Sequence, residues 1–133
     1  MSYQLDTNVV VDALRQGSGP VQRRLRAAMS DGVAISSIVR FELWYGVVRS
    51  GNQDRHAELL RAFLAGPVDV LHFGVDEADC AAEIRADLAS DGRLIGPYDI
   101  MIAAQALRAD ATLVTANTRE FHRVKGLRCE NWR

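Results

Sequence analysis

Four acidic side chains lie at sequence positions from which they could form one cluster and bind a cation together. Asp6 directly follows a short apolar run, and Glu42 lies inside a longer apolar segment. Asp99 follows Gly96-Pro97-Tyr98, and Glu120 follows another short apolar run. Carboxylates at close range repel one another, so a cluster either raises its pKa values or binds a cation. Oxygen ligands without histidine or cysteine favour Mg²⁺ or Mn²⁺.

Each of these acids also has an ordinary structural explanation. Asp6 could cap a helix or stabilise a turn, and Asp99 could complement a helix dipole from the first helical turn. Glu42 has only apolar residues and a glycine three and four positions away, so its carboxylate is expected to be partly buried. A buried carboxylate needs a partner, and either a metal ion or a distant arginine would serve.

The segment Thr115–Glu120 follows the last of the predicted inner strands. Glu120 is a further candidate acid there, and Asn117 could act as a neutral ligand or position a water molecule. The alternative is an ordinary turn from strand to helix, capped by Thr118.

Composition narrows the class of protein. The chain has 133 residues and a formal net charge of −1, which is the size of a single domain spanning residues 1–133. No signal peptide or membrane-spanning run is visible, and the two cysteines show no paired spacing, which together predict a cytoplasmic protein with reduced thiols. The three histidines are scattered and do not suggest a zinc site; they are His56, His72 and His122.

Short strands alternate with helices along the sequence. The predicted strands are Tyr3–Leu5, Val33–Ile35, Val68–Phe73, Thr112–Val114 and an edge strand within Leu127–Trp132. The predicted helices are Asn8–Leu14, Val21–Met29, Ile38–Arg49, Asp54–Leu64, Glu77–Leu88, a buried Tyr98–Leu107 and a single turn, Thr118–His122. Their expected N-terminal caps are Thr7, Ser36 or Ser37, Asp76 and Thr118.

This alternation predicts an α/β fold with a parallel, doubly wound sheet. In such a sheet, ligands bind beyond the carboxyl ends of the strands. Asp6 and the Thr115–Glu120 segment follow strands directly, so we expect them at that edge. The helices Ile38–Arg49 and Asp54–Leu64 could also form an apolar groove suited to an amphipathic partner helix.

Motifs over nearly the whole chain resemble the PIN domain, and most closely the VapC toxins of the enteric type. The similar segments, in order, are Leu5–Asn8, Ile35–Ile38, Phe41–Gly46, Gly96–Asp99, Met101–Ala103, Thr115–Phe121 and Val124–Trp132. The order and spacing of these motifs are highly specific.

The resemblance implies a three-layer α/β/α fold with a parallel sheet. It implies a Mg²⁺- or Mn²⁺-dependent endoribonuclease that cleaves structured RNA, such as tRNA or rRNA, as the toxin of a toxin–antitoxin pair. It further implies a VapB-type antitoxin as partner, a homodimer, a higher toxin–antitoxin complex, and contact with DNA only through the antitoxin.

Carried over by position, the resemblance implies that Asp6, Glu42 and Asp99 are the core metal-binding acids. Many PIN domains have a fourth aspartate where this chain has Asn117, and Glu120 is the implied substitute. That change leaves the binding of a second metal ion open. The resemblance also implies supporting polar roles, which fall to Thr7 and Thr115.

Two other functional classes remain as alternatives. A catalytically weak PIN-like module could bind RNA or protein without cutting, but it would be expected to lack some of the metal acids. A phosphotransfer enzyme or receiver domain also groups acids at strand ends, yet it usually needs a lysine after a strand, and Lys125 is the only lysine. For phosphate contacts the candidates are arginines, whose planar fork suits phosphate: Arg93, Arg119 and Arg123.

Overall fold

The sheet at the centre of the molecule has five strands, all parallel, in the order β3-β2-β1-β4-β5. The computed structural model describes residues 2–15 and 17–133. The strands are β1 (Tyr3–Leu5), β2 (Val33–Ser36), β3 (Val68–Leu71), β4 (Thr112–Val114) and β5 (Cys129–Glu130). The prediction of a parallel α/β fold is confirmed.

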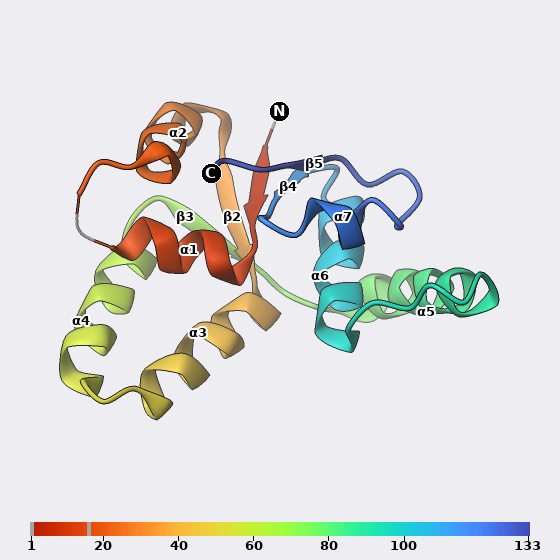
Figure 1. Ribbon diagram of the computed structural model, residues 1–133, viewed down its shortest axis with the longest axis horizontal. Helices are drawn as coiled ribbons and strands as arrows, with labels where there is room; N and C mark the ends of the chain where they lie inside the picture. The colour runs from red at the N-terminus through yellow and green to blue at the C-terminus, as the bar shows by residue number, and fades with distance from the viewer. Residues whose placement is uncertain (1, 16) are drawn as a thin grey trace.

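Helices cover both faces of this sheet, and Figure 1 shows α1 to α4 on one side and α5 and α6 on the other. The helices are α1 (Thr7–Leu14), α2 (Pro20–Ala28), α3 (Ser37–Arg49), α4 (Gln53–Leu64), α5 (Val75–Ser90), α6 (Pro97–Arg108) and α7 (Thr118–Phe121). A short 3₁₀ turn, Met29–Asp31, follows α2. These three layers follow from right-handed crossovers, which place the helices on opposite faces when the direction of strand addition reverses.

The reversal occurs at β1, which lies between β2 and β4. From β1 the chain adds β2 and then β3 toward one edge, and it later returns to add β4 and β5 toward the other. Such a switch point leaves a crevice at the carboxyl ends of the two diverging strands. Asp6 follows β1 and Thr115 follows β4, so both lie at this crevice.

The hydrophobic core includes side chains from β1, β4 and α6. Leu5, Leu113 and Val114 on the strands are fully buried, as are Ile102 and Ala103 on α6. The expectation that the helix after Gly96 is buried is therefore confirmed.

Three expected caps were wrong because a neighbouring group occupies the cap position. Asp6 caps α1, and Thr7 is the first helical residue rather than the cap. Asn117 precedes α7, so Thr118 lies inside that helix. Gly74 occupies the cap position of α5, where its N–H donates to Glu77, and Asp76 lies within the first turn.

Other boundaries differ by a few residues. β3 ends at Leu71 instead of Phe73, and only Cys129–Glu130 of the predicted edge strand pairs with β4. The two cysteines are separate thiols, and all three histidines are exposed. Among the described residues, no helix combines the length and hydropathy needed to cross a lipid bilayer.

Candidate active site

Asp6 lies at the carboxyl end of the central strand and is 7% exposed. Its Oδ1 accepts a hydrogen bond from the backbone N–H of Thr7 at 2.9 Å, and its Oδ2 accepts one from Oγ1 of Thr115 at 2.8 Å. The capping role and a place in the acidic cluster are therefore compatible, because each oxygen keeps a further lone pair. Both bonds fix the orientation of the carboxylate.

Glu42 is joined to Asp6 through a single residue. Oγ1 of Thr7 donates to Oε1 of Glu42 at 2.9 Å, while the N–H of the same threonine bonds Asp6. Glu42 is carried by α3, which begins directly after β2 because Oγ of Ser36 accepts from the N–H groups of Ile38 and Val39 in the first turn of the helix. The alternative of an arginine partner for Glu42 is not observed among the described residues, where none of the four candidate acids forms an ion pair.

Asp99 lies in the first turn of α6, two residues after the Pro97 that begins the helix. Its pKa is raised to about 6, first by burial and then by the negative charges of Asp6, Glu42 and Glu120. This coupling means that the four acids, far apart in sequence, lie within electrostatic range of one another.

The segment after β4 supplies the remaining polar groups. The backbone N–H of Asn117 donates to Oγ1 of Thr115 at 3.0 Å, and Nδ2 of Asn117 donates to Oε2 of Glu120 at 2.9 Å. Thr115 is fully buried and donates onward to Asp6. Asn117 therefore holds Glu120 beside the cluster and keeps its own side-chain oxygen for another partner.

The acids do not form a finished metal site. In the part of the chain that the structure describes, no three acidic, histidine or cysteine side chains are already gathered at metal-ligand geometry. The donor set is nonetheless all oxygen, partly dehydrated and mutually repelling, which suits a hard divalent cation. The candidate ligands are Asp6, Glu42, Asp99, Asn117 and Glu120.

Of the three candidate arginines, two are exposed and one is bonded to backbone carbonyls. Arg93 and Arg119 are exposed and remain free to meet a phosphate, but the guanidinium of Arg123 donates to backbone carbonyls of residues 93 and 94. A contact of this kind joins segments far apart in sequence, and no local pattern could have indicated it.

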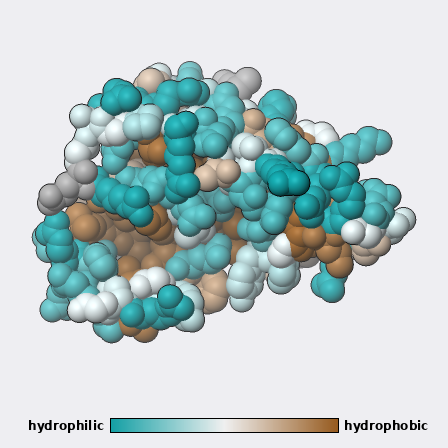
Figure 2. Space-filling view, viewed as in Figure 1, coloured by the Kyte–Doolittle hydropathy of each residue, from teal (hydrophilic) through white to brown (hydrophobic). Residues whose placement is uncertain are grey.

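A groove of about 520 Å³ opens beside the acids. Figure 2 shows it as a hollowed hydrophobic area on the side of α1, α3 and α4. Its apolar lining comes from Val11, Leu14, Leu43, Val47, Leu59 and Leu60. Thr7 and Glu42 form one part of its wall, while Arg15, Arg55 and His56 form another.

Comparison with known proteins agrees with this architecture. The family described as "PIN domain" matches residues 3–127. The sequence is 36% identical to the tRNA(fMet)-specific endonuclease VapC of Shigella flexneri, over 99% of this chain and 98% of that protein. It is 37% identical to ribonuclease VapC2 of Rickettsia felis over the same shares.

Solved structures give the same picture. VapBC2 of Rickettsia felis, bound to a DNA fragment from its promoter, superposes with a TM-score of 0.93 at 34% identity and covers 100% of both chains. DNA-bound VapBC of Salmonella typhimurium superposes with a TM-score of 0.92 at 34% identity, covering 100% of this chain and 99% of the other. The fold, the position of the acids at the switch point and these full-length similarities lead to one assignment. The chain belongs to the PIN-domain family and, within it, to the VapC ribonucleases of toxin–antitoxin systems.

Proposed function

We propose that the protein is a divalent-metal-dependent endoribonuclease that cleaves structured RNA, such as a tRNA or an rRNA, and acts as the toxin of a toxin–antitoxin pair. The observation that carries this proposal is the hydrogen-bonded arrangement that joins Asp6 to Glu42 through Thr7 and to Thr115 at one crevice. The pKa of Asp99, raised by burial and by the charges of Asp6, Glu42 and Glu120, agrees with it. Evolving such repulsion without a cation to relieve it would only destabilise the fold. The names of two VapC relatives, a tRNA(fMet)-specific endonuclease and a ribonuclease, support the same function.

In this proposal Asp6, Glu42 and Asp99 hold Mg²⁺ or Mn²⁺, and the side-chain oxygen of Asn117 can add a ligand. A bound divalent ion supplies an activated water and neutralises charge on the scissile phosphate. Attack by water needs no ribose 2′-OH, so the expected products carry a 5′-phosphate and a 3′-hydroxyl.

The chain's own residues prepare the acids for that role. Thr7 and Thr115 fix both oxygens of Asp6, and Thr7 also fixes Glu42. Glu120, held by Asn117, is placed to bind or orient a water molecule. Because three of the acids are hydrogen-bonded before any ion arrives, only part of the site has to reorganise on binding.

The exchange of Asp99 for Asn tests the proposal. Asp99→Asn removes a charge and little volume, so the fold survives while cleavage of an RNA substrate falls about a hundredfold or more. Cleavage is measured with purified tRNA in Mg²⁺ and in EDTA, and metal binding is measured by calorimetry with Mn²⁺. The proposal fails if wild-type protein neither binds Mn²⁺ nor cuts RNA, or if Asp99→Asn retains full activity.

A PIN-like binding module without activity is the second candidate. Such a module would be expected to lack some of the metal-binding acidic residues. In this chain Asp6, Glu42 and Asp99 are all present and electrostatically coupled. The coupling favours the nuclease.

We also propose that a VapB-type antitoxin inserts an amphipathic helix into the groove between α1, α3 and α4. The apolar lining suits such a helix, and an occupant would lie directly against Thr7 and Glu42.

Two related VapBC complexes were solved on DNA. By analogy with those complexes, we propose that this chain reaches DNA only through the antitoxin. Since its RNA targets belong to translation, the site of action is the cytoplasm.

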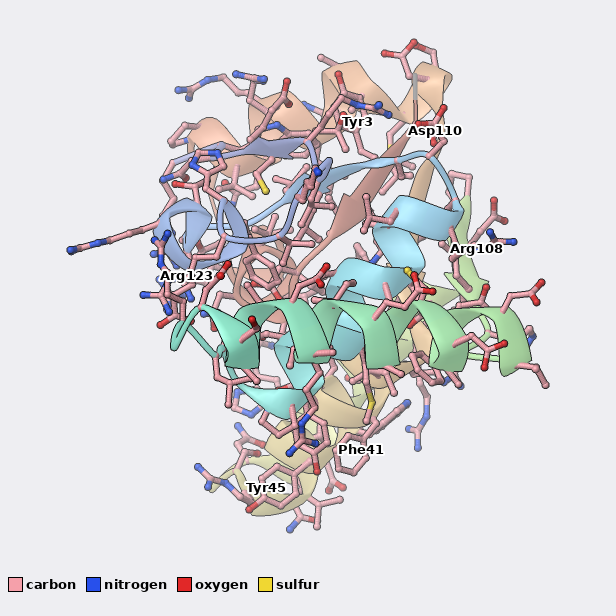
Figure 3. The ribbon with its side chains drawn as sticks, turned by 90° about the vertical axis from the view of Figure 1, so that its right-hand side faces the viewer. Tyr3, Phe41, Tyr45, Arg108, Asp110 and Arg123 are labelled. Atoms are coloured by element: carbon pink, nitrogen blue, oxygen red, sulfur yellow. The ribbon has the colours of Figure 1, made fainter. Side chains whose placement is uncertain are left out.

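An exposed apolar patch supports a homodimer, which would also allow a higher toxin–antitoxin complex. The patch comprises Phe41, Tyr45 and Tyr98, with Val48 one turn further along α3, and these side chains are between 47% and 65% exposed. The ring of Phe41 stacks on Tyr45 at 6.4 Å and meets Tyr98 edge-on at 5.6 Å. Figure 3 shows Phe41 and Tyr45 together at the outer face of α3. Such a patch marks an association surface, and a second copy is the partner we propose.

A further inference from the structure

Arg123 joins two segments that carry different acids of the site. It follows α7, and its Nη1 donates to the carbonyl of Leu94 at 3.2 Å and, more weakly, to the carbonyl of Arg93 at 3.5 Å. Figure 3 shows Arg123 close to the end of α5, where the 91–96 loop begins. The contact is tertiary, because residue 123 lies 29 positions after Leu94.

The 91–96 loop leads directly to Asp99. The loop is fixed at its start by the Arg93 N–H, which donates to Leu88 at 2.8 Å, and by Gly92, whose φ of 66° suits glycine. Its far end is Gly96, the N-terminal cap position of α6. Arg123 forms hydrogen bonds to the loop between these two ends. This contact therefore affects where the first turn of α6 lies.

The backbone of Arg123 is connected to Glu120. The backbone N–H of Arg123 donates to the carbonyl of Glu120 at 3.0 Å, and Phe121 between them is fully buried. Glu120 is in turn bonded to Asn117, whose N–H bonds Thr115. The backbone under Arg123 is therefore anchored, and its guanidinium extends from a fixed base.

We infer that Arg123 is a positioning residue, which ties the 91–96 loop to α7 and thereby sets Asp99 at its working distance from Glu120. The inference rests on the proposed metal-dependent nuclease. It differs from a phosphate contact, since Nη1 of Arg123 already donates to carbonyl oxygens of the loop and its Nε is buried without a partner among the described residues.

The chain offers a matched control. Arg119 lies on α7, one turn before Arg123, is exposed, and forms no ion pair or side-chain hydrogen bond among the residues described. Arg119→Gln and Arg123→Gln remove the same charge from the same region, and only the second removes the tie. Arg123→Lys keeps the charge and can offer one donor to Leu94.

The experiment compares these variants without relying on activity alone. Amide hydrogen exchange of residues 91–98 in EDTA reports the loop, and Mn²⁺ calorimetry reports the site. We expect Arg123→Gln to speed exchange in the loop about fivefold or more and to weaken Mn²⁺ binding about tenfold. It should also lower kcat with little change in KM for RNA. Arg119→Gln should resemble wild type in exchange and Mn²⁺ affinity, and Arg123→Lys should recover part of both losses.

The outcomes separate this inference from the proposed function. If wild type binds no Mn²⁺ and cuts no RNA, the nuclease proposal itself fails. If wild type is active and Arg123→Gln leaves loop exchange and Mn²⁺ affinity unchanged while raising KM in step with Arg119→Gln, then Arg123 is a phosphate contact and the inference is overturned. A fall in thermal stability with unchanged Mn²⁺ affinity in the folded protein also overturns it, because the role is then structural only.

Discussion

At the scale of single residues, the site is organised by side chains that serve two neighbours at once. Thr7 uses its backbone N–H for Asp6 and its hydroxyl for Glu42. Thr115 donates to Asp6 and accepts from the N–H of Asn117. Two threonines thus connect three candidate ligands from β1, α3 and the end of β4. Outer partners of this kind set the geometry of metal ligands.

Thr7→Val keeps the shape of the side chain and removes the hydroxyl that holds Glu42. We expect Mn²⁺ affinity, measured by calorimetry, to fall about tenfold, with the backbone bond to Asp6 retained. Thr7→Ser keeps the hydroxyl and should bind nearly as wild type does. Equal affinities for Val, Ser and wild type would remove Thr7 from the site.

The raised pKa of Asp99 predicts a pH dependence of stability in metal-free buffer. Asp99 titrates near 3.8 when unfolded and at about 6 in the fold, so the folded state holds the extra proton between these values. The free energy of unfolding should therefore fall as pH rises from about 4 through 6. Partial exposure screens the effect, so Asp99→Asn should gain only about 1 kcal/mol at pH 7.

Urea unfolding in EDTA, repeated from pH 4 to pH 8, measures this difference. The stability gap between Asp99→Asn and wild type should open as pH rises and close again when saturating Mg²⁺ is added to wild type. A gap that is constant with pH would show that Asp99 titrates normally and is not crowded by other acids.

At the scale of elements, the sequence was informative where periodicity and strand composition dominate. The strands Tyr3–Leu5 and Thr112–Val114 have the expected bounds, because short buried apolar runs between polar turns have few alternative structures. Cap positions were less predictable. Asp6 and Thr7 can both cap a helix, and the choice is decided by Thr115 and Glu42, which lie far away in sequence.

The same limit applies to the site. The acids at strand ends could be predicted from topology, since parallel strands bring their carboxyl ends to one edge. The partners of Arg123 could not, because they are backbone carbonyls of a loop whose path is set by tertiary packing.

Ser36 gives a test at this scale. Its fully buried hydroxyl accepts from the N–H groups of Ile38 and Val39 and thereby starts α3, the helix that carries Glu42. Ser36→Ala should lower the free energy of unfolding by about 1–2 kcal/mol. Asn52→Ala is the matched control, since Asn52 occupies the cap position of α4 without a side-chain hydrogen bond. Equal losses for the two variants, measured in urea, would contradict the assigned cap.

At the scale of the whole molecule, two apolar surfaces lie next to candidate ligands of the site. The groove between α1, α3 and α4 reaches Glu42 from one side. The exposed patch includes Phe41 and Tyr98, each adjacent in sequence to a candidate ligand. An antitoxin helix and a second copy would therefore bind at separate surfaces, and both would lie close to the acids of the same crevice.

Tyr45→Asp places a charge in the exposed patch and should disrupt the proposed homodimer. An unpaired charge buried against a second copy is costly, so we expect the dimer Kd to rise about a hundredfold or more. Light scattering after size-exclusion chromatography measures the mass. Val75→Asp, at an apolar side chain that is 79% exposed on α5 and outside the patch, is the control. A Tyr45→Asp variant that remains dimeric would assign the interface elsewhere.

The position of β1 between β2 and β4 has a consequence for how the protein is made. The bond between Asp6 and Thr115 spans 109 positions, and β1 cannot pair with β4 until almost the entire polypeptide has been translated. A nascent chain still attached to the ribosome can pair β1 with β2, yet it lacks Thr115, Asn117 and Glu120. Under the proposed activity, the enzyme matures only at the end of synthesis, so an unfinished toxin is harmless to the RNA that is producing it.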